Sequence, residues 1–298
     1  MKFRFGYFIF LFGLLLLAGC SASTAPTPTK EKEGITIVAA ENFYGEVAKI
    51  VGGEKVKVIS ILDGGVMDPE DFSPTPKDAK DVAGASLVIY NGLGYDAWIE
   101  KLLSASKVEN RQEVAVATDL LKLKKGDNPH VWYNLEVIPK LAVFLADELA
   151  KKDPQNEAIY RKNAQNYLKK FDTLIQKENS LVQSSPVPIE STETIFEYMA
   201  KKLNLAPQTP GFAQAVFNGV DPSPDNLISI EKNVKEKRIK FLVYNSKTKS
   251  QEVDRLVKLA KEKRIPIVAV TEQKPDRKTY ISWMEDILDK LGVALNGK

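Results

Sequence analysis

The sequence predicts an α/β fold with mostly parallel sheets, because short apolar strands alternate with helices in both halves of the chain. The chain has 298 residues, 44% of them apolar, which is enough for one large or two small domains with a real core. Residues 35–40 form a short, β-branched apolar run, as expected of a strand buried on both faces. A helix over 42–51 follows, and a second strand over 56–61 comes after the Gly52-Gly53 break.

The same alternation continues along the chain and restarts after residues 184–186. The further expected helices cover 77–84, 194–203, 227–237, 250–263 and 280–291, and the further strands cover 87–90, 187–189, 241–244 and 267–270. The two halves also resemble each other, since a Pro-x-Pro segment, a helix and a strand ending in Tyr-Asn occur in both, at Tyr90-Asn91 and Tyr244-Asn245. This repetition fits two related lobes with a ligand cleft between them.

Residues 154–183 are predicted to form one long amphipathic helix. Apolar side chains recur at three- and four-residue steps, including Tyr160, Ala164, Tyr167, Phe171 and Leu174. Such a helix would be roughly 40 Å long. From the pattern alone, it either braces two lobes or packs inside one domain. On the two-lobe interpretation, the N-terminal lobe covers 35–150 and the C-terminal lobe covers 186–298.

The first 20 residues have the order of a secretory signal peptide. A positive start with Lys2 and Arg4 precedes an apolar stretch over 8–17, which is too short to span a membrane with a stop-transfer flank. The following Ala18-Gly19-Cys20 resembles the lipobox of bacterial lipoproteins, which implies that Cys20 is the lipidated N-terminus of the mature protein. The alternative is an ordinary signal with an incidental cysteine. Residues 21–34, rich in Ser, Thr, Pro and charge, are expected to be a flexible tether.

The charge and motif content exclude several classes of function. The net charge is only +3, and lysines alternate with acids, so we expect no nucleic-acid partner. The sequence contains no His-Glu-x-x-His, Gly-x-Ser-x-Gly, Walker or Cys-x-x-Cys motif. Because His130 is the single histidine, the sequence argues against an acid–base enzyme or a zinc hydrolase, and we find no candidate catalytic residue. We therefore expect a binding protein rather than an enzyme.

Four short motifs occur in a specific order along the mature chain. They are Asp68-Pro69-Glu70-Asp71-Phe72-Ser73-Pro74-Thr75-Pro76, Asn128-Pro129-His130-Val131-Trp132, Glu193-Thr194-Ile195-Phe196-Glu197-Tyr198, and Thr271-Glu272 followed by Thr279-Tyr280. Each motif is weak by itself. In this order they resemble the exported metal-binding proteins of zinc/manganese ABC importers, known as cluster A-I solute-binding proteins, and the resemblance extends from about Gly34 to the end.

This resemblance implies a metal site in the cleft between two (β/α) lobes that one long helix joins. Carried over position by position, the metal ligands would be Glu70, His130, Glu193 and Glu272, two from each lobe. Glu70 stands where the family usually has histidine, and Asp71 beside it is an alternative ligand. Glu272 stands where aspartate is commoner.

Three carboxylates and one imidazole would bind a divalent transition metal such as Mn²⁺, Fe²⁺ or Zn²⁺. The predominance of oxygen ligands favours Mn²⁺ or Fe²⁺, whereas the usual order of affinities favours Zn²⁺ over Mn²⁺. Lys278 or Arg277 is a candidate to balance the residual negative charge. With an ordinary pKa of about 6.5, His130 would weaken metal binding below neutral pH as it protonates.

The resemblance also implies the protein's place and partner. We expect a monomeric lipoprotein, anchored to the outer face of the bacterial cytoplasmic membrane, that captures the metal ion and delivers it to the permease of an ABC importer. The alternative is a surface lipoprotein of the same fold whose metal site is degenerate and which acts as an adhesin or interaction protein.

Overall fold

Two four-stranded parallel sheets form the centres of two lobes, which confirms the predicted α/β fold. The computed structural model describes residues 34–63, 69 and 72–297, so Cys20, Glu70 and Asp71 lie outside the described residues. The first sheet contains β1 (Ile35–Glu41), β2 (Val56–Leu62), β3 (Leu87–Tyr90) and β4 (Gln112–Ala115). The second contains β5 (Val187–Ser191), β6 (Leu205–Pro207), β7 (Leu242–Asn245) and β8 (Ile267–Val270). The strand orders are β2-β1-β3-β4 and β6-β5-β7-β8, so both lobes have the same topology.

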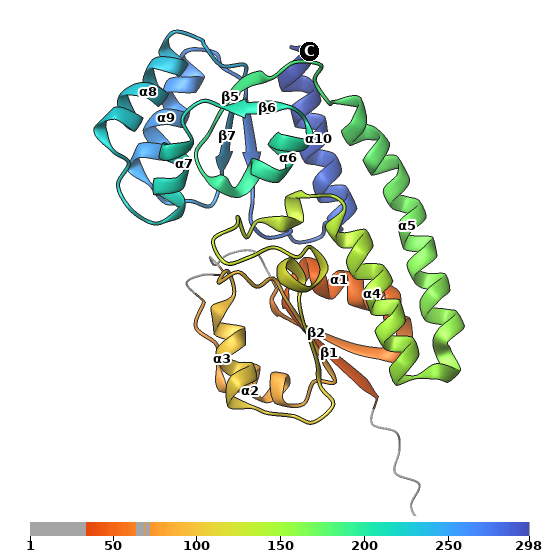
Figure 1. The fold of residues 1–298 in the computed structure, drawn as a ribbon. Coiled ribbons are helices and arrows are strands. Elements are labelled where there is room, and N and C mark those ends of the chain that lie inside the picture. The colour runs from red at the N-terminus through yellow and green to blue at the C-terminus, as the bar shows by residue number, and fades with distance from the viewer. Residues whose placement is uncertain (1–33, 64–68, 70–71, 298) are drawn as a thin grey trace, which may run out of the picture. The chain divides into compact units, whose positions relative to one another are not determined.

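The helices pack around these sheets (Figure 1). In the first lobe they are α1 (Asn42–Gly52), α2 (Pro76–Ala83), α3 (Ala97–Ala105) and α4 (Val137–Lys152). The long α5 (Glu157–Ser180) follows, and the second lobe has α6 (Glu197–Lys202), α7 (Pro210–Phe217), α8 (Pro224–Lys235), α9 (Gln251–Glu262) and α10 (Tyr280–Asn296). Below, the first lobe means β1 to α4 and the second lobe means β5 to α10.

Strand β1 shows why the sequence forms a central parallel strand. Ile37 and Ala39 are fully buried in the core on one face of the sheet, and Val38 and Ala40 are fully buried in the core on the other. β1 pairs in parallel with β2 on one side and with β3 on the other. A strand enclosed on both faces needs continuous apolar sequence, which residues 35–40 supply.

Helix α5 contacts helices of both lobes. It packs against α4 and α1 in the first lobe and against α10 in the second. Figure 1 shows it running past α4 and α10. Of the nine apolar side chains from which its apolar face was predicted, five are buried, and Leu168 and Ile175 are half-buried. The predicted range of 154–183 was too long, because the helix ends at Ser180 and the last predicted side chain, Val182, is exposed. The helix is preceded by a 3₁₀ turn at Pro154–Asn156, where proline occupies a first-turn position that needs no N–H donor.

The two lobes share a core and several hydrogen bonds. Tyr133 of the first lobe donates its hydroxyl to the Thr271 carbonyl at 2.8 Å, and Tyr280 of α10 donates its hydroxyl to the Trp132 carbonyl at 2.5 Å. Glu46 of α1 accepts the backbone N–H of Tyr280 at 2.9 Å and thereby satisfies a donor at the N-terminus of α10. The segment between β8 and α10, which carries Glu272, is therefore held against the first lobe.

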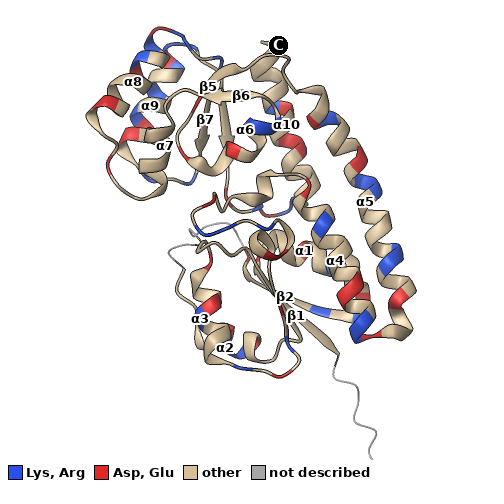
Figure 2. Ribbon diagram, in the orientation of Figure 1, with Lys and Arg blue, Asp and Glu red and all other residues tan. Residues whose placement is uncertain are grey.

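The surface charge is mixed rather than segregated. Figure 2 shows basic and acidic positions interspersed along α5, α8 and α9. Local ion pairs connect some of them, as where Glu231 of α8 contacts Lys235 at 2.5 Å and Arg255 of α9 at 2.6 Å. Such interspersed charge is typical of a solvated surface.

The topology itself indicates where a ligand would bind. In open parallel sheets, ligands bind beyond the carboxyl ends of the strands, at the point where the strand order reverses. In the second lobe this point lies between β5 and β7. Glu193 follows β5 by two residues, Asn245 is the last residue of β7, and Glu272 follows β8 by two residues. The two predicted carboxylate ligands of this lobe therefore lie at the expected edge.

Candidate metal site

His130 is buried, and its hydrogen bonds define which ring nitrogen is available. Its side chain is 1% exposed. The Asn128 amide group donates to the Thr194 carbonyl and to Glu197 Oε2, both at 2.8 Å, so Asn128 Oδ1 is the acceptor atom. That oxygen accepts the His130 backbone N–H at 2.9 Å and lies 2.8 Å from Nδ1. Nδ1 therefore carries the proton, and Nε2 keeps the lone pair that a metal ion needs.

Burial also changes the protonation of this histidine. Removal from water disfavours the charged imidazolium and lowers the pKa of His130 to about 3. The expectation that His130 protonates just below neutral pH is therefore wrong for the metal-free protein. The ring is neutral throughout the physiological range, so protons compete weakly with metal for Nε2.

Aromatic rings surround His130 on several sides. The ring centroids of Trp132, Phe217 and Tyr95 lie 5.3, 5.1 and 6.0 Å from that of His130. Phe217 ends α7 of the second lobe, whereas Tyr95 lies in the turn between β3 and α3 of the first. These rings exclude water from the imidazole, which explains its depressed pKa and would strengthen any metal–nitrogen bond made there.

Asn245 brings the carboxylates of Glu193 and Glu272 together. Its amide nitrogen donates to Glu193 Oε2 at 3.0 Å and to Glu272 Oε1 at 2.8 Å. The other Glu193 oxygen accepts the hydroxyl of Thr248, and the other Glu272 oxygen accepts the hydroxyl of Tyr95 at 3.2 Å. Two acidic side chains held side by side by neutral donors form a strongly negative site, as a divalent cation requires.

The structure thus places the predicted ligands as follows. Glu193 and Glu272 share a donor, and Tyr95 contacts both Glu272 and the ring of His130. In the part of the chain that the structure describes, no three His, Cys, Asp or Glu side chains are close enough to hold one metal ion. Glu70 and Asp71 lie outside that part. Lys278, a candidate for charge balance, instead forms an ion pair with Asp286.

Several residues of this site were not predicted from the sequence. Tyr95 and Phe217 belong to no motif, Asn128 belongs to the His130 motif without a role of its own having been predicted, and Asn245 was noted only as part of the Tyr-Asn repeat at the ends of β3 and β7, which is a signal that could have found it. Its counterpart Asn91 is fully buried and donates to the Pro129 carbonyl at 2.9 Å, next to His130. The equivalent asparagine in each lobe therefore supports a predicted metal ligand.

A buried pair of acids supports the loop that Asn91 belongs to. Asp96 accepts the backbone N–H groups of Asn91 at 2.5 Å and Gly92 at 2.8 Å. Glu41 lies beside it, fully buried, and its carboxyl group interacts with that of Asp96. Burial, reinforced by the nearby acid, raises the pKa of Glu41 well above its usual value, and burial raises that of Asp96 to about 7.

This pair predicts a dependence of stability on pH. The pKa values of Glu41 and Asp96 are both raised in the folded state, so above about pH 4.5 the folded protein binds more protons than the unfolded chain. The free energy of unfolding therefore decreases as the pH rises toward 7 and beyond. Glu41→Gln removes one titrating group. Between pH 5 and 8 the free energy of unfolding of this variant should therefore fall less steeply than that of wild type, with a difference in slope of up to about 1.4 kcal/mol per pH unit. Urea denaturation at four pH values measures this, with the exposed Glu54→Gln as control. Parallel curves for wild type and Glu41→Gln would contradict it.

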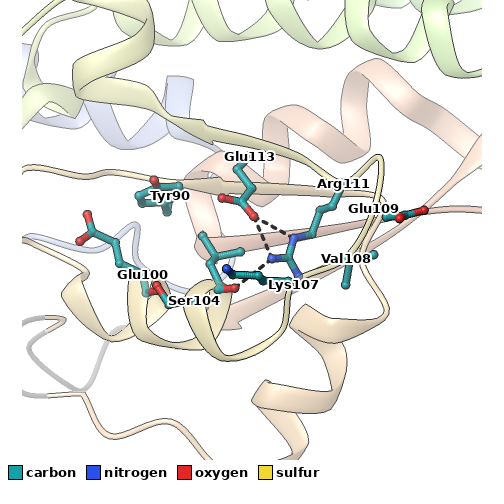
Figure 3. A pocket seen from close by; sticks show the side chains of 9 residues that line it. Tyr90, Glu100, Ser104, Lys107, Val108, Glu109, Arg111 and Glu113 are labelled. Carbon is teal, nitrogen blue, oxygen red and sulfur yellow. Dashed lines mark hydrogen bonds and ion pairs between the residues drawn. The ribbon is translucent and has the colours of Figure 1, made fainter.

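Two surface cavities lie near these elements. One, of about 570 Å³, is lined by α3 and the segment leading into β4, where Arg111 contacts Glu113 at 2.8 Å (Figure 3). It contains none of the predicted metal ligands. A second cavity, of about 400 Å³, is bordered by Glu193 together with Ser191, Lys201 and Pro210 of the second lobe.

Comparison with known families decides what kind of protein carries this site. The family model described as the periplasmic zinc-uptake complex component A, ZnuA, matches residues 37–294. The chain belongs to this family. The match covers both lobes and α5, and it includes His130, Glu193 and Glu272.

Individual relatives agree with this family, and a solved structure agrees with the fold. The metal ABC transporter substrate-binding lipoprotein SsaB of Streptococcus sanguinis is 29% identical over 283 residues, covering 88% of this chain and 89% of SsaB. The manganese ABC transporter substrate-binding lipoprotein PsaA of Streptococcus pneumoniae is 28% identical, with the same coverage. Among solved structures, the Ni²⁺ complex of the solute-binding protein FpvC of P. aeruginosa has a TM-score of 0.73 at 20% identity, covering 88% of this chain and 97% of FpvC. This last likeness shows the fold.

Proposed function

We propose that this family member is an extracytoplasmic solute-binding lipoprotein, which captures a divalent metal ion and delivers it to the permease of an ABC importer. The observation that carries the proposal is the carboxylate pair of Glu193 and Glu272, which Asn245 bridges at the switch point of the second sheet. The family membership supports the transport role, because its model describes a zinc-uptake component. The ligand is cargo that the protein binds and releases.

The ligand set proposed for the ion is His130 through Nε2, Glu193 and Glu272, completed by Glu70 or by Asp71. The neutral imidazole and the two carboxylates suit Mn²⁺, Fe²⁺ or Zn²⁺. Relatives with similar sequences are named as manganese ABC transporter substrate-binding lipoproteins, and structural neighbours are described with bound Ni²⁺ or Mn²⁺. These names support a transition metal ion as the cargo.

The proposal includes an anchor, a partner and the absence of catalysis. We propose that lipid on Cys20 anchors a monomer to the outer face of the cytoplasmic membrane, since relatives across 88% of the chain are named lipoproteins. In the described ranges, none of the helices is both long and apolar enough to cross a membrane. The permease would be the direct partner, and the protein would bind and release its ion without turnover.

Metal titration of the soluble part, residues 21–298, tests this function. After the protein has been stripped with a chelator, Mn²⁺, Fe²⁺ and Zn²⁺ are titrated in a calorimeter at pH 7.5. At least one ion should bind with a stoichiometry of one. At 100 times its dissociation constant, that ion should stabilise the fold by about 2.7 kcal/mol, which raises the melting temperature. If no ion gives saturable heat or a thermal shift, the degenerate-site alternative replaces this proposal.

A further inference from the structure

The proposed ligand His130 is enclosed by aromatic rings, so an ion that reaches it must pass one of them. The side chain of His130 is 1% exposed, and the rings of Trp132, Tyr95 and Phe217 lie around it. Trp132 and Tyr95 are buried, whereas Phe217 is half-buried. Of these three rings, Phe217 is therefore the one that solvent reaches.

Phe217 also packs less against the rest of the protein than the other two rings do. Trp132 and Tyr95 belong to the large apolar core that extends through both lobes. Phe217 belongs to none of the three apolar clusters formed by the residues that the structure describes. Within that part of the chain, its ring contact is with His130, at 5.1 Å between centroids and 69° between planes. Moving this ring would therefore leave the cores intact.

Helix α7 presents Phe217 from the second lobe. Directly before the helix, Thr209 donates its backbone N–H and its hydroxyl to Glu190, at 3.0 and 2.7 Å. At the other end, Gly219 adopts φ +66° and donates its N–H to the Val216 carbonyl at 3.0 Å, which closes the last turn. The backbone of α7 is thus held at both ends, while residues 218–220 beside Phe217 are exposed. The ring can therefore move by rotation about its side-chain bonds.

Separation of the lobes is a less favourable route to His130. The segment that carries this residue is bonded to the second lobe, because the Asn128 amide donates to the Thr194 carbonyl at 2.8 Å and Tyr198 donates its hydroxyl to the Asn128 carbonyl at 2.7 Å. Separating the lobes here would break these hydrogen bonds, whereas turning the ring of Phe217 breaks none. Rotation of the ring therefore requires less free energy.

We infer that Phe217 is a gate: its ring covers His130, and turning it aside lets the metal ion reach this ligand and leave it again. This inference rests on the proposed function, because it concerns entry to the same site. Phe217 comes from the same lobe as the proposed ligands Glu193 and Glu272, and an ion held by those carboxylates approaches His130 from that lobe.

The strength of the ring contact sets the size of the expected effect. An edge-to-face aromatic contact by itself favours the packed position about 2- to 13-fold, and the apolar area that the ring buries adds to this preference. The ring of Phe217 is therefore expected to lie aside for about a tenth of the time or less. Binding slows by the fraction of molecules that are open, so removing the ring should speed metal association about tenfold.

Carbethoxylation of His130 in the metal-free protein tests the gate without any metal ion. Diethyl pyrocarbonate acylates a neutral imidazole nitrogen, and the product has an ultraviolet band of its own. Because His130 is the single histidine and burial keeps it neutral, this band reports His130 alone. The full chain is purified in a nonionic detergent and stripped with a chelator. Phe217→Ala should raise the rate constant about tenfold, and Phe217→Leu, which keeps a smaller apolar side chain, should raise it less.

Metal exchange kinetics test the same gate in the proposed function. Stopped-flow absorbance with a weak chromophoric indicator follows the association of Mn²⁺ and Zn²⁺, and trapping with excess chelator follows dissociation. In Phe217→Ala the association rate constant should rise about tenfold for both ions. The dissociation rate constant should rise at least as much, because water then reaches the metal–nitrogen bond as well. A ring that only shielded this bond, or only stabilised the fold, would leave the association rate constant unchanged.

Phe144→Ala is the matched control for both measurements. Phe144 lies on α4, is half-buried like Phe217, and packs against the large apolar core. Among the described residues it has no ring contact with His130. Its replacement removes the same phenyl group from a helix and should leave the carbethoxylation rate and the association rate constants as in wild type, whatever it does to the melting temperature.

Three results would separate the possibilities. If His130 of Phe217→Ala reacted with the reagent no faster than in wild type, another group would cover it and the inference would be overturned. Faster carbethoxylation with an unchanged association rate constant would also overturn it, since exposure of His130 would then not limit metal entry. If the wild-type chain binds no ion while Phe217→Ala still speeds carbethoxylation, the proposed function fails, although the ring does cover His130.

Discussion

Replacing His130 with alanine should lower the affinity for the transported metal ion by more than about 100-fold at pH 7.5. The substitution removes a proposed ligand itself, which should cost more than the 10- to 100-fold typical of residues that only orient ligands. No other imidazole can take its place, because His130 is the single histidine in the chain. Its neutral state at this pH means that the loss reflects a missing nitrogen ligand rather than a missing charge. Competition with a chelator measures the change.

A second variant separates loss of the ligand from disturbance of its buried surroundings. Asn128→Ala leaves the imidazole in place and removes the acceptor that holds its Nδ1 proton. The affinity should fall by about 10- to 100-fold, less than for His130→Ala. Both metal-free variants must still unfold cooperatively for the comparison to be valid. If His130→Ala bound metal within threefold of wild type and at full stoichiometry, His130 would not be a ligand.

The regular elements were predictable where the local pattern and the tertiary environment agree. Residues 35–40 are apolar at every position because β1 is enclosed on both faces, and the apolar face of α5 repeats at helical spacing because only that face is buried. Helices α3, α4 and α7 and strands β4 and β6 were not predicted. α4 (Val137–Lys152) is buried at positions spread along its whole length, and it contains Pro139 in its first turn, which looks like an interruption in the sequence but is tolerated there.

The pattern could not decide between one domain and two lobes, and the structure shows why. Each lobe has its own sheet, yet one continuous core includes Trp132 of the first lobe and Trp283 of the second. The hydroxyl groups of Tyr133 and Tyr280 link the lobes by bonds between residues about 140 positions apart in the chain. Contacts between such distant residues leave no local periodicity, so no short window of sequence can reveal them.

In the candidate site, the predicted ligands had a local sequence pattern, whereas the residues that hydrogen-bond to them did not. His130, Glu193 and Glu272 were predicted as ligands because each belongs to a short motif of chemically distinctive residues. Asn245 acts through hydrogen bonds to Glu193 and Glu272, and Tyr95 through one to Glu272, and all of these connect residues far apart in the sequence. An asparagine at a strand end is also common for many other reasons. Their roles depend on where the carboxyl ends of strands meet, which only the sheet order defines.

Replacing Cys20 with serine should remove nearly all lipid label from the protein. The proposed anchor is attached to the thiol of this residue, and no other cysteine in the chain can substitute for it. Acyl chains bind membranes with about 0.8 kcal/mol for each buried CH₂ group, and stable attachment needs more than one chain or a second signal. The tether over 21–34 is polar and mixed in charge, so it offers no such second signal.

Metabolic labelling with palmitate, followed by separation of membrane and soluble fractions, measures this loss. The label should disappear, and the mature-sized protein, where it forms, should move to the soluble fraction. Ser21→Ala is the matched control, because it changes the neighbouring residue and keeps the thiol, so both label and membrane fraction should remain as in wild type. A Cys20→Ser protein that still carried label would show that the anchor is attached elsewhere. The metal affinity of Cys20→Ser should equal that of wild type, because all the proposed metal ligands belong to the compact unit that begins at Gly34.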